Sequence, residues 1–185
     1  MRVLIGIPTS EIARFVDFYG YLDKLIKPVD TITFRPQSTS VAKNRNAIVR
    51  EAIENGCSHI FFIDDDMCFP SFTLMRLLGH NKVIASGLIC KRTLPLEIIS
   101  RSLACTLIHT EVFKSTDEPW FRIGQIHPDE LMEDIDFFDR VGLDVFVDTA
   151  LSIGHHFNGI IWANGRITVG NQLYGVKHAN IRSSD

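Results

Sequence analysis

Short apolar runs alternate with segments of helical periodicity through the first half of the chain. The apolar runs predict buried strands. They span residues 3–7, 31–34, 59–63 and 83–88. Between them, apolar side chains recur at spacings of three and four, which predicts amphipathic helices. These helical segments span residues 11–26, 40–54 and 70–79. Alternating strands and helices are typical of an α/β fold whose sheet is flanked by helices.

Turn and cap residues stand where these elements should begin and end. Ser40 precedes the second helical segment and can accept a hydrogen bond from the first turn. Asn55-Gly56 ends that segment, since glycine readily adopts the left-handed conformation after a helix. Near the carboxyl end, Asn164-Gly165 separates two apolar runs and predicts a β-hairpin.

The second half of the chain is less regular. It predicts further strands at 104–109 and 145–147, a helical turn at 111–115 and an acidic helix at 130–140. The hairpin strands would be residues 160–163 and 166–169. No repeat or linker interrupts the chain, so we expect one domain over residues 1–185, with a loosely held tail after about residue 177.

Composition narrows the classes of protein that fit. Of 185 residues, 45% are hydrophobic and 22% charged, which is typical of a globular domain. A formal charge of −3 argues against a broad basic face for nucleic acid. No apolar run is long enough for a transmembrane helix, and the first residues lack a signal-peptide pattern. We therefore expect a cytoplasmic protein.

The cysteines point to neither zinc nor disulfides. No CxxC pair occurs, which makes a zinc ribbon improbable. Their low density in a chain of this length favours buried thiols in a reducing compartment. The cysteines are Cys57, Cys68, Cys90 and Cys105.

Three consecutive aspartates, Asp64 to Asp66, directly follow the apolar run at 59–63. In α/β sheets, ligands bind outside the carboxyl ends of the strands. Asp64 and Asp66 are two positions apart on an extended segment, so they can face one site. Oxygen ligands of this kind suit Mg²⁺ or Mn²⁺ carrying phosphate groups. The alternative is a solvated turn that merely ends a strand. A haloacid-dehalogenase phosphatase fits poorly, because its motif belongs on the first strand and Cys68 stands at the fifth position.

An ordered set of motifs resembles family 2-like glycosyltransferases of the GT-A fold. The set consists of Ile5-Gly6-Ile7-Pro8-Thr9, Arg45-Asn46, the DxD motif Asp64-Asp65-Asp66, the ED pair Glu133-Asp134, and Gly154-His155. The resemblance covers roughly residues 3 to 157. It implies a Rossmann-like mixed sheet flanked by helices. The compact spacing resembles short stand-alone enzymes of viruses, which would act in a host cytoplasm.

The resemblance also implies a role for each motif. Pro8, Thr9, Arg45, Asp64 and Asp65 would bind the nucleotide-sugar donor. Asp64, Asp66 and His155 would ligate Mn²⁺ or Mg²⁺, although His156 competes with its neighbour for that role. Asp134, with Glu133 beside it, would be the general base of an inverting transfer.

The implied reaction moves a hexosyl group from a nucleotide-diphosphate sugar, most simply a UDP-sugar, to a hydroxyl of a glycan or other acceptor. A divalent cation would offset the charge of the diphosphate leaving group. A carboxylate would accept the proton of the acceptor hydroxyl. The ordinary explanation for Glu133 and Asp134 is that acidic residues stabilise the first turn of a helix.

Two further groups of residues are candidates for binding. Lys91 and Arg92 follow a predicted strand and would add positive charge on the ligand side of the sheet. Trp120 and Phe121 could stack on a sugar or could fill the core. Two other functions stay open, namely a nucleotidyltransferase of related fold and a non-catalytic nucleotide-sugar-binding module. A nucleotidyltransferase would want a Gly-rich, basic loop after the first strand, which this sequence lacks.

Overall fold

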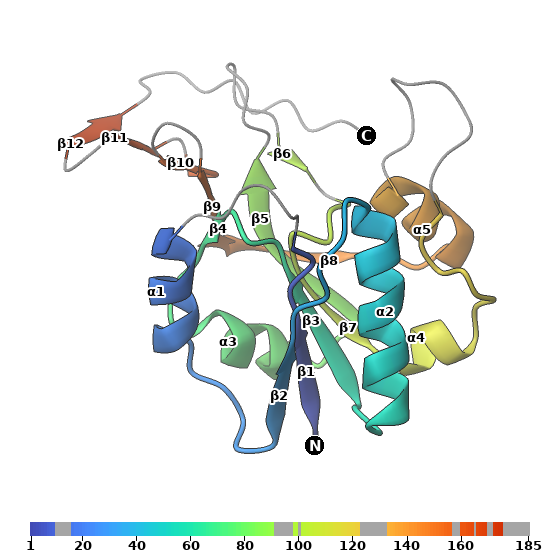
Figure 1. Ribbon diagram of the computed structural model, residues 1–185. Helices are drawn as coiled ribbons and strands as arrows, with labels where there is room; N and C mark the ends of the chain where they lie inside the picture. The colour runs from blue at the N-terminus through green and yellow to red at the C-terminus, as the bar shows by residue number, and fades with distance from the viewer. Residues whose placement is uncertain are drawn as a thin grey trace.

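The computed structural model describes residues 1–9, 16–90, 98–99, 101–122, 133–156, 160–164, 166–169 and 172–175 (Figure 1). A mixed β-sheet forms its centre. In spatial order its strands are β2 (Thr31–Phe34), β1 (Val3–Gly6), β3 (His59–Ile63), β7 (Cys105–His109), β5 (Ile84–Cys90) and β6 (Ile98–Ile99), while β8 (Phe146–Ser152) also pairs with β5. Strand β1 runs parallel to β2 and β3, and β7 runs antiparallel to β3 and β5.

Helices cover both faces of this sheet. Helices α1 (Val16–Lys24) and α3 (Thr73–Gly79) lie on one side, and α2 (Val41–Glu54), α4 (Glu111–Lys114) and α5 (Glu133–Val141) lie on the other (Figure 1). Phe61 packs with the first group of helices, and its neighbours Ile60 and Phe62 pack with the second. Because successive strand residues face opposite sides, a strand covered on both faces needs an unbroken apolar run.

The predicted end signals of α2 are confirmed. The Ser40 side chain accepts a hydrogen bond from the Lys43 backbone nitrogen at 3.3 Å. Gly56, just beyond the helix, has a φ of 64°, in the region that favours glycine. The Ser40 cap fixes where α2 begins, and therefore which of its residues lie at the carboxyl edge of the sheet. Gly56 marks where the helix ends.

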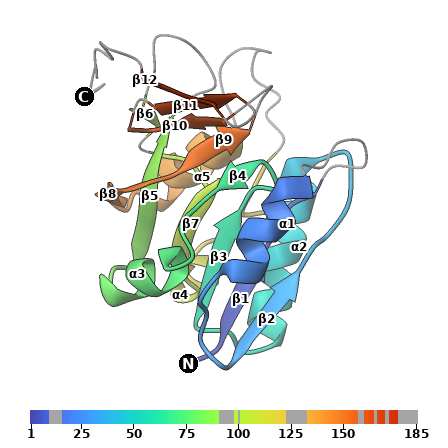
Figure 2. The ribbon, with the colours of Figure 1, turned by 90° about the vertical axis from the view of Figure 1, so that its left-hand side faces the viewer.

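A second, antiparallel sheet lies beyond the carboxyl ends of the main strands (Figure 2). Its strands, in spatial order, are β12 (Gln172–Gly175), β11 (Arg166–Val169), β10 (Ile160–Trp162), β9 (Gly154–His156) and β4 (Met67–Cys68). Strands β10 and β11 pair antiparallel, so the predicted hairpin is confirmed. Pairing of β4 with β9 brings the segment after the three aspartates beside His155.

The structure also corrects the predicted elements. The strand expected at 145–147 extends to Ser152, and the strand expected at 83–88 extends to Cys90. Strands β4, β6, β9 and β12 were not predicted. Residues 11–15 and 130–132 of two expected helices, and the tail after 177, lie outside the described residues.

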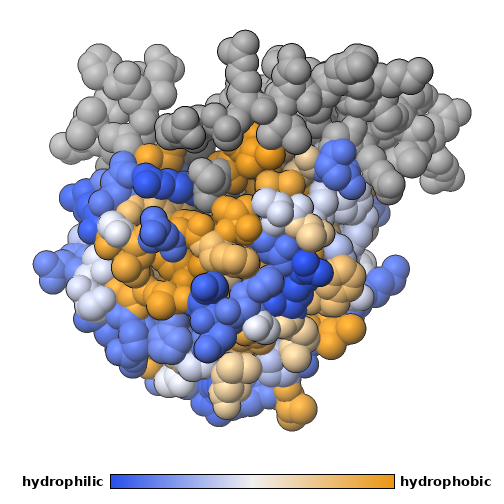
Figure 3. All heavy atoms as spheres, turned by 180° about the vertical axis from the view of Figure 1, so that it is seen from behind, coloured by the Kyte–Doolittle hydropathy of each residue, from blue (hydrophilic) through white to orange (hydrophobic). Residues whose placement is uncertain are grey.

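The surface and the cysteines agree with a folded globular chain. Seen from behind, an apolar area is bordered by polar side chains (Figure 3). All four cysteines are buried and unpaired, as predicted, and burial raises the pKa of the Cys68 thiol to about 12. None of the helices described here is long and apolar enough to span a bilayer.

Candidate active site at the carboxyl edge of the sheet

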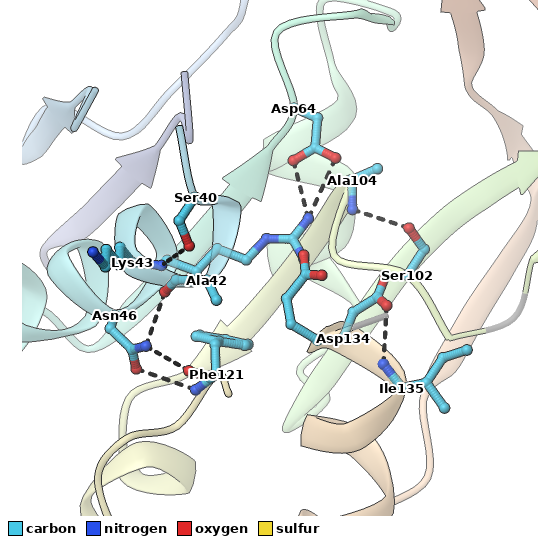
Figure 4. Close-up of polar contacts among 12 residues, drawn as sticks. Ser40, Ala42, Lys43, Asn46, Asp64, Ser102, Ala104, Phe121, Asp134 and Ile135 are labelled. Carbon is cyan, nitrogen blue, oxygen red and sulfur yellow. Dashed lines mark hydrogen bonds and ion pairs between the residues drawn. The ribbon is translucent and has the colours of Figure 1, made fainter. Parts of the chain in front are cut away.

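Arg45 joins three separate elements of the fold. Its side chain is 4% exposed, and its Nη1 donates to Oε1 of Glu133 at 2.5 Å. Its Nη2 lies 3.2 and 3.3 Å from the two carboxylate oxygens of Asp64. Asp64 and Asp134 both lie in this part of the structure (Figure 4). The structure thus brings together α2, the end of β3 and the start of α5.

Local sequence explains why these residues meet. The run His59–Ile63 is buried as β3, and Asp64 is the first residue past it. The Asp64 backbone nitrogen still donates to the carbonyl oxygen of Ala104, which fixes the point where the carboxylate leaves the sheet. Glu133 and Asp134 stand in the first turn of α5, where negative charge is favoured by the helix dipole.

Asp134 is a carboxylate in a poorly solvated place. It is 7% exposed, and its Oδ1 accepts a hydrogen bond from the Ile135 backbone nitrogen at 2.9 Å. Burial raises the pKa of Asp134 above its ordinary value, and the Arg45 guanidinium opposes that rise while Glu133 adds to it. A raised pKa makes this side chain a better proton acceptor than an exposed aspartate.

Among the described residues around Arg45, carboxylates outnumber guanidinium groups. Burial alone would lower the pKa of Arg45, but Asp64, Glu133 and Asp134 together outweigh that effect and raise it, so the guanidinium stays ionised. One guanidinium therefore faces the carboxylates of Asp64, Glu133 and Asp134. Clustered carboxylates favour binding of a further cation.

The two residues of the Arg-Asn pair have different partners. The Asn46 amide nitrogen donates to the carbonyl oxygens of Ala42 at 2.8 Å and Phe121 at 2.7 Å. The Asn46 amide oxygen accepts from the Phe121 backbone nitrogen at 3.1 Å. Asn46 thus ties the segment Pro119–Arg122, which we call the strap, to α2 (Figure 4).

Trp120 and Phe121 in the strap fill the core. They are 6% and 1% exposed, and the Trp120 indole nitrogen donates to the carbonyl oxygen of Phe113 at 2.8 Å. Of the two roles considered for these aromatic residues, the structure supports packing.

Asp66 and His155 lie on neighbouring segments. The His156 backbone nitrogen donates to the carbonyl oxygen of Asp66 at 2.8 Å, and Met67 pairs with His155. The His155 ring Nδ1 lies 2.6 Å from the carbonyl oxygen of Cys90. A carbonyl oxygen only accepts, so Nδ1 carries the hydrogen; an imidazole with its hydrogen at Nδ1 has, when neutral, its lone pair at Nε2. Histidines that bind a metal through one ring nitrogen typically donate a hydrogen bond from the other one in this way.

His156 has different surroundings from His155. Its ring centroid lies 6.3 Å from that of Tyr21, in an edge-on contact toward α1. Of the two histidines, His155 is thus the better candidate for a ligand.

The donor set fits a divalent cation that takes part of its coordination from a substrate. Within the described ranges, no group of three or more His, Cys, Asp or Glu side chains is placed to hold a metal. Asp64 is paired with Arg45, and the carboxylate of Asp66 and the imidazole of His155 are of a chemical type that binds such a cation. Mg²⁺ commonly uses one or two protein carboxylates together with phosphate oxygens and water. The metal ligands named from the sequence therefore stay a prediction.

The first strand ends in a tightly bonded loop. Pro8 and Thr9 are buried, and the Thr9 hydroxyl donates to the carbonyl oxygen of Ile7 at 3.2 Å. The Asn44 amide nitrogen donates to the carbonyl oxygen of Thr9 at 3.0 Å. This loop therefore lies at the carboxyl edge, as expected. The other two predicted donor-binding residues, Lys91 and Arg92, lie outside the described residues.

Sequence reasoning missed Asn46 as the residue that holds the strap, and it missed the Cys90 carbonyl beside His155. Neither partner can be found from residue spacing, because each contact joins segments far apart in the chain.

Comparison with known proteins identifies the fold. No family model matches the chain, and no curated protein sequence matches it. Among solved structures, A197 from STIV is 17% identical with a TM-score of 0.63, over 100% of this chain and 99% of that one. S. aureus TarS 1-349 is 14% identical with a TM-score of 0.56, over 82% of this chain and 59% of that one.

A structure of TarS 1-349 in complex with UDP-GlcNAc has the same identity and TM-score, over 82% of this chain and 57% of that one. At these identities the likeness shows a shared fold. The predicted α/β fold of GT-A type, a mixed sheet flanked by helices, is confirmed.

Proposed function

We propose that this chain is a glycosyltransferase of the family 2-like type, which moves a sugar from a nucleotide-diphosphate donor to an acceptor hydroxyl. The observation that carries the proposal is the meeting of Arg45, Asp64 and the Glu133-Asp134 pair at the carboxyl edge of a GT-A-type sheet. Because one structural neighbour is described in complex with UDP-GlcNAc, a UDP-sugar is the first donor to test.

The donor would lie across the ends of β1 and β3. The loop of Pro8 and Thr9 would border the base, and Asp64 would accept hydrogen bonds from hydroxyls of the ribose or sugar. Arg45 holds Asp64 in place from the protein side, through Nη2. Asp65 would contribute to donor binding beside Asp64, and Lys91 and Arg92 would face the diphosphate.

Asp66 and His155 would hold Mn²⁺ or Mg²⁺. When bound, the cation supplies positive charge to the diphosphate as it leaves. On the protein side, the Cys90 carbonyl keeps His155 in the tautomer with its lone pair at Nε2. The excess of carboxylates over guanidinium groups among the described residues around Arg45 supports this role for a cation.

Asp134 would act as the general base. The acceptor oxygen attacks the anomeric carbon, the bond from that carbon to the diphosphate oxygen breaks, and its electron pair stays on the diphosphate. The proton of the acceptor hydroxyl passes to Asp134, whose burial raises its proton affinity. Attack from the face opposite the leaving group inverts the anomeric configuration.

The test combines turnover with donor binding. The full chain is incubated with UDP-sugars, Mn²⁺ and a panel of hydroxyl acceptors, and released UDP and glycosylated product are measured. The variant Asp134→Asn should keep donor affinity and lose transfer by about 10²- to 10⁴-fold. The control Asp139→Asn changes an exposed aspartate of the same helix and should leave both unchanged.

Four outcomes would contradict the proposal or one of its assignments. Unchanged transfer in Asp134→Asn would show that Asp134 is not the general base. Loss of donor binding in that variant would show that Asp134 acts in donor binding instead. Metal-dependent nucleotide binding without turnover would indicate a binding module. Pyrophosphate release from a nucleoside triphosphate would indicate a nucleotidyltransferase.

A further inference from the structure

Helix α5 carries Glu133 and Asp134 of the proposed reaction centre in its first turn. Its main apolar anchor is Phe137, which is fully buried. The ring centroid of Phe137 lies 5.3 Å from that of Phe113 and 4.8 Å from that of Phe121. These contacts hold the apolar face of α5 against the core.

Glu133 of α5 pairs with Arg45, and the contacts between α5 and the strap centre on Asp136. Arg122 donates to Asp136 through both Nη2, at 2.5 Å, and Nε, at 3.0 Å. The Nε of Arg140 donates to the same carboxylate at 3.0 Å, and Arg140 also donates to the carbonyl oxygen of Trp120. A two-point fork between guanidinium and carboxylate fixes orientation as well as distance.

The fork grips the helix from the side away from Asp134. Two positions along an α-helix correspond to a rotation of about 200°, so Asp134 and Asp136 lie on roughly opposite sides. A rotation of about 10° would move a carboxylate lying roughly 6 Å from the helix axis by about 1 Å. Misplacement of about 1 Å can cost on the order of 10²-fold in rate.

Arg122 belongs to the strap, which Asn46 ties to α2. The strap therefore joins the helix that carries Arg45 to the helix that carries Asp134. We propose that Asp136, held by Arg122 and Arg140, is a positioning residue that sets the rotation of α5 and thereby aims Asp134 at the acceptor hydroxyl. This inference rests on the glycosyl transfer proposed above.

The test compares two aspartates of one helix. Asp139 pairs with Arg101 at 2.5 Å, but both side chains are 55% exposed, so Asp139→Asn is the matched control for Asp136→Asn. We expect Asp136→Asn to lower kcat by about 10- to 100-fold and to leave the donor KM within about twofold. Asp136→Glu, which keeps the charge, should recover part of kcat, and Asp139→Asn should match the wild type.

Arg122→Met provides a second route to the same result, since it removes the fork while leaving Asp136 and Arg140 in place. Melting curves confirm that each variant is folded at the assay temperature. If Asp136→Asn and Arg122→Met keep the kcat of Asp139→Asn, or change only KM, the positioning role is wrong while the transfer activity stands. If the wild type transfers no sugar, the premise fails and both proposals are overturned.

Discussion

Replacement of Arg45 by methionine tests the centre of the site directly. Methionine keeps much of the side-chain volume and removes the guanidinium, so Asp64 and Glu133 lose their shared partner. Asp64 and Glu133 would then face each other and Asp134 without a cation between them. We expect the fold to lose stability for that electrostatic reason.

The size of the loss follows from burial. The Arg45 side chain is 4% exposed, while those of Asp64 and Glu133 are 28% and 22% exposed. Removing one partner of a fully buried pair costs about 3–5 kcal/mol. Water reaches part of both carboxylates here, so we expect a loss of about 2–4 kcal/mol. For a chain of this size that corresponds to a Tm lower by roughly 5–15 °C.

The assay is denaturant unfolding at neutral pH, with Arg50→Met as control. Arg50 lies on the same helix and pairs with Glu118, but these side chains are 50% and 46% exposed, so its replacement should cost less than about 1 kcal/mol. Adding Asp64→Asn and Glu133→Gln to Arg45→Met should recover part of the loss. Equal losses in Arg45→Met and Arg50→Met would refute the reasoning.

Three further variants test other parts of the structure. Gly6→Ala places a Cβ 2.3 Å from the Cγ2 of buried Ile48 and should cost about 1–3 kcal/mol in denaturant unfolding, whereas Gly20→Ala meets nothing within 4 Å and should cost nothing. Asp148 accepts hydrogen bonds from Nε and Nη2 of Arg76 and lies 2.7 Å from Nε2 of His80, and these contacts hold its pKa well below its usual 3.8. Asp148→Asn should therefore lower Tm at neutral pH, and its difference from the wild type should shrink as pH falls below about 4; a constant difference would contradict this. Because burial raises the pKa of Asp134, its charge opposes folding, so Asp134→Asn should melt no lower than the wild type at neutral pH, with any gain lost below the ordinary pKa of 3.8. A lower Tm for Asp134→Asn would show that its charge stabilises the fold.

Sequence patterns predicted the elements that local physics dictates. Buried parallel strands need unbroken apolar runs, which is why β3 was evident from His59 to Ile63. Helix α2 was evident from Ser40 and Gly56, because its caps act within a few residues. The meeting of Asp64 with the Glu133-Asp134 pair followed from the resemblance, since no spacing rule joins positions so far apart.

The remaining features depend on tertiary contacts. The antiparallel direction of β7 and the two-residue strand β4 carry no periodic signal that could be recognised in the sequence. The fork on Asp136 could not be predicted either, because Arg122 and Arg140 are two of many arginines in a chain with plentiful carboxylates. Burial decides which pairs matter, and burial is a property of the fold.

Thermal melting with nucleotide sugars, with and without Mn²⁺, tests the central claim most directly. The claim is that the edge beside β3 binds a donor diphosphate through a cation held by Asp66. For UDP-, GDP-, dTDP- and CMP-sugars at about 100 times Kd, one nucleotide class should raise Tm by roughly 5–10 °C with Mn²⁺ present. That rise should vanish in Asp66→Ala and persist in Asp139→Asn. No rise with any nucleotide sugar, or an equal rise in Asp66→Ala, would contradict the account.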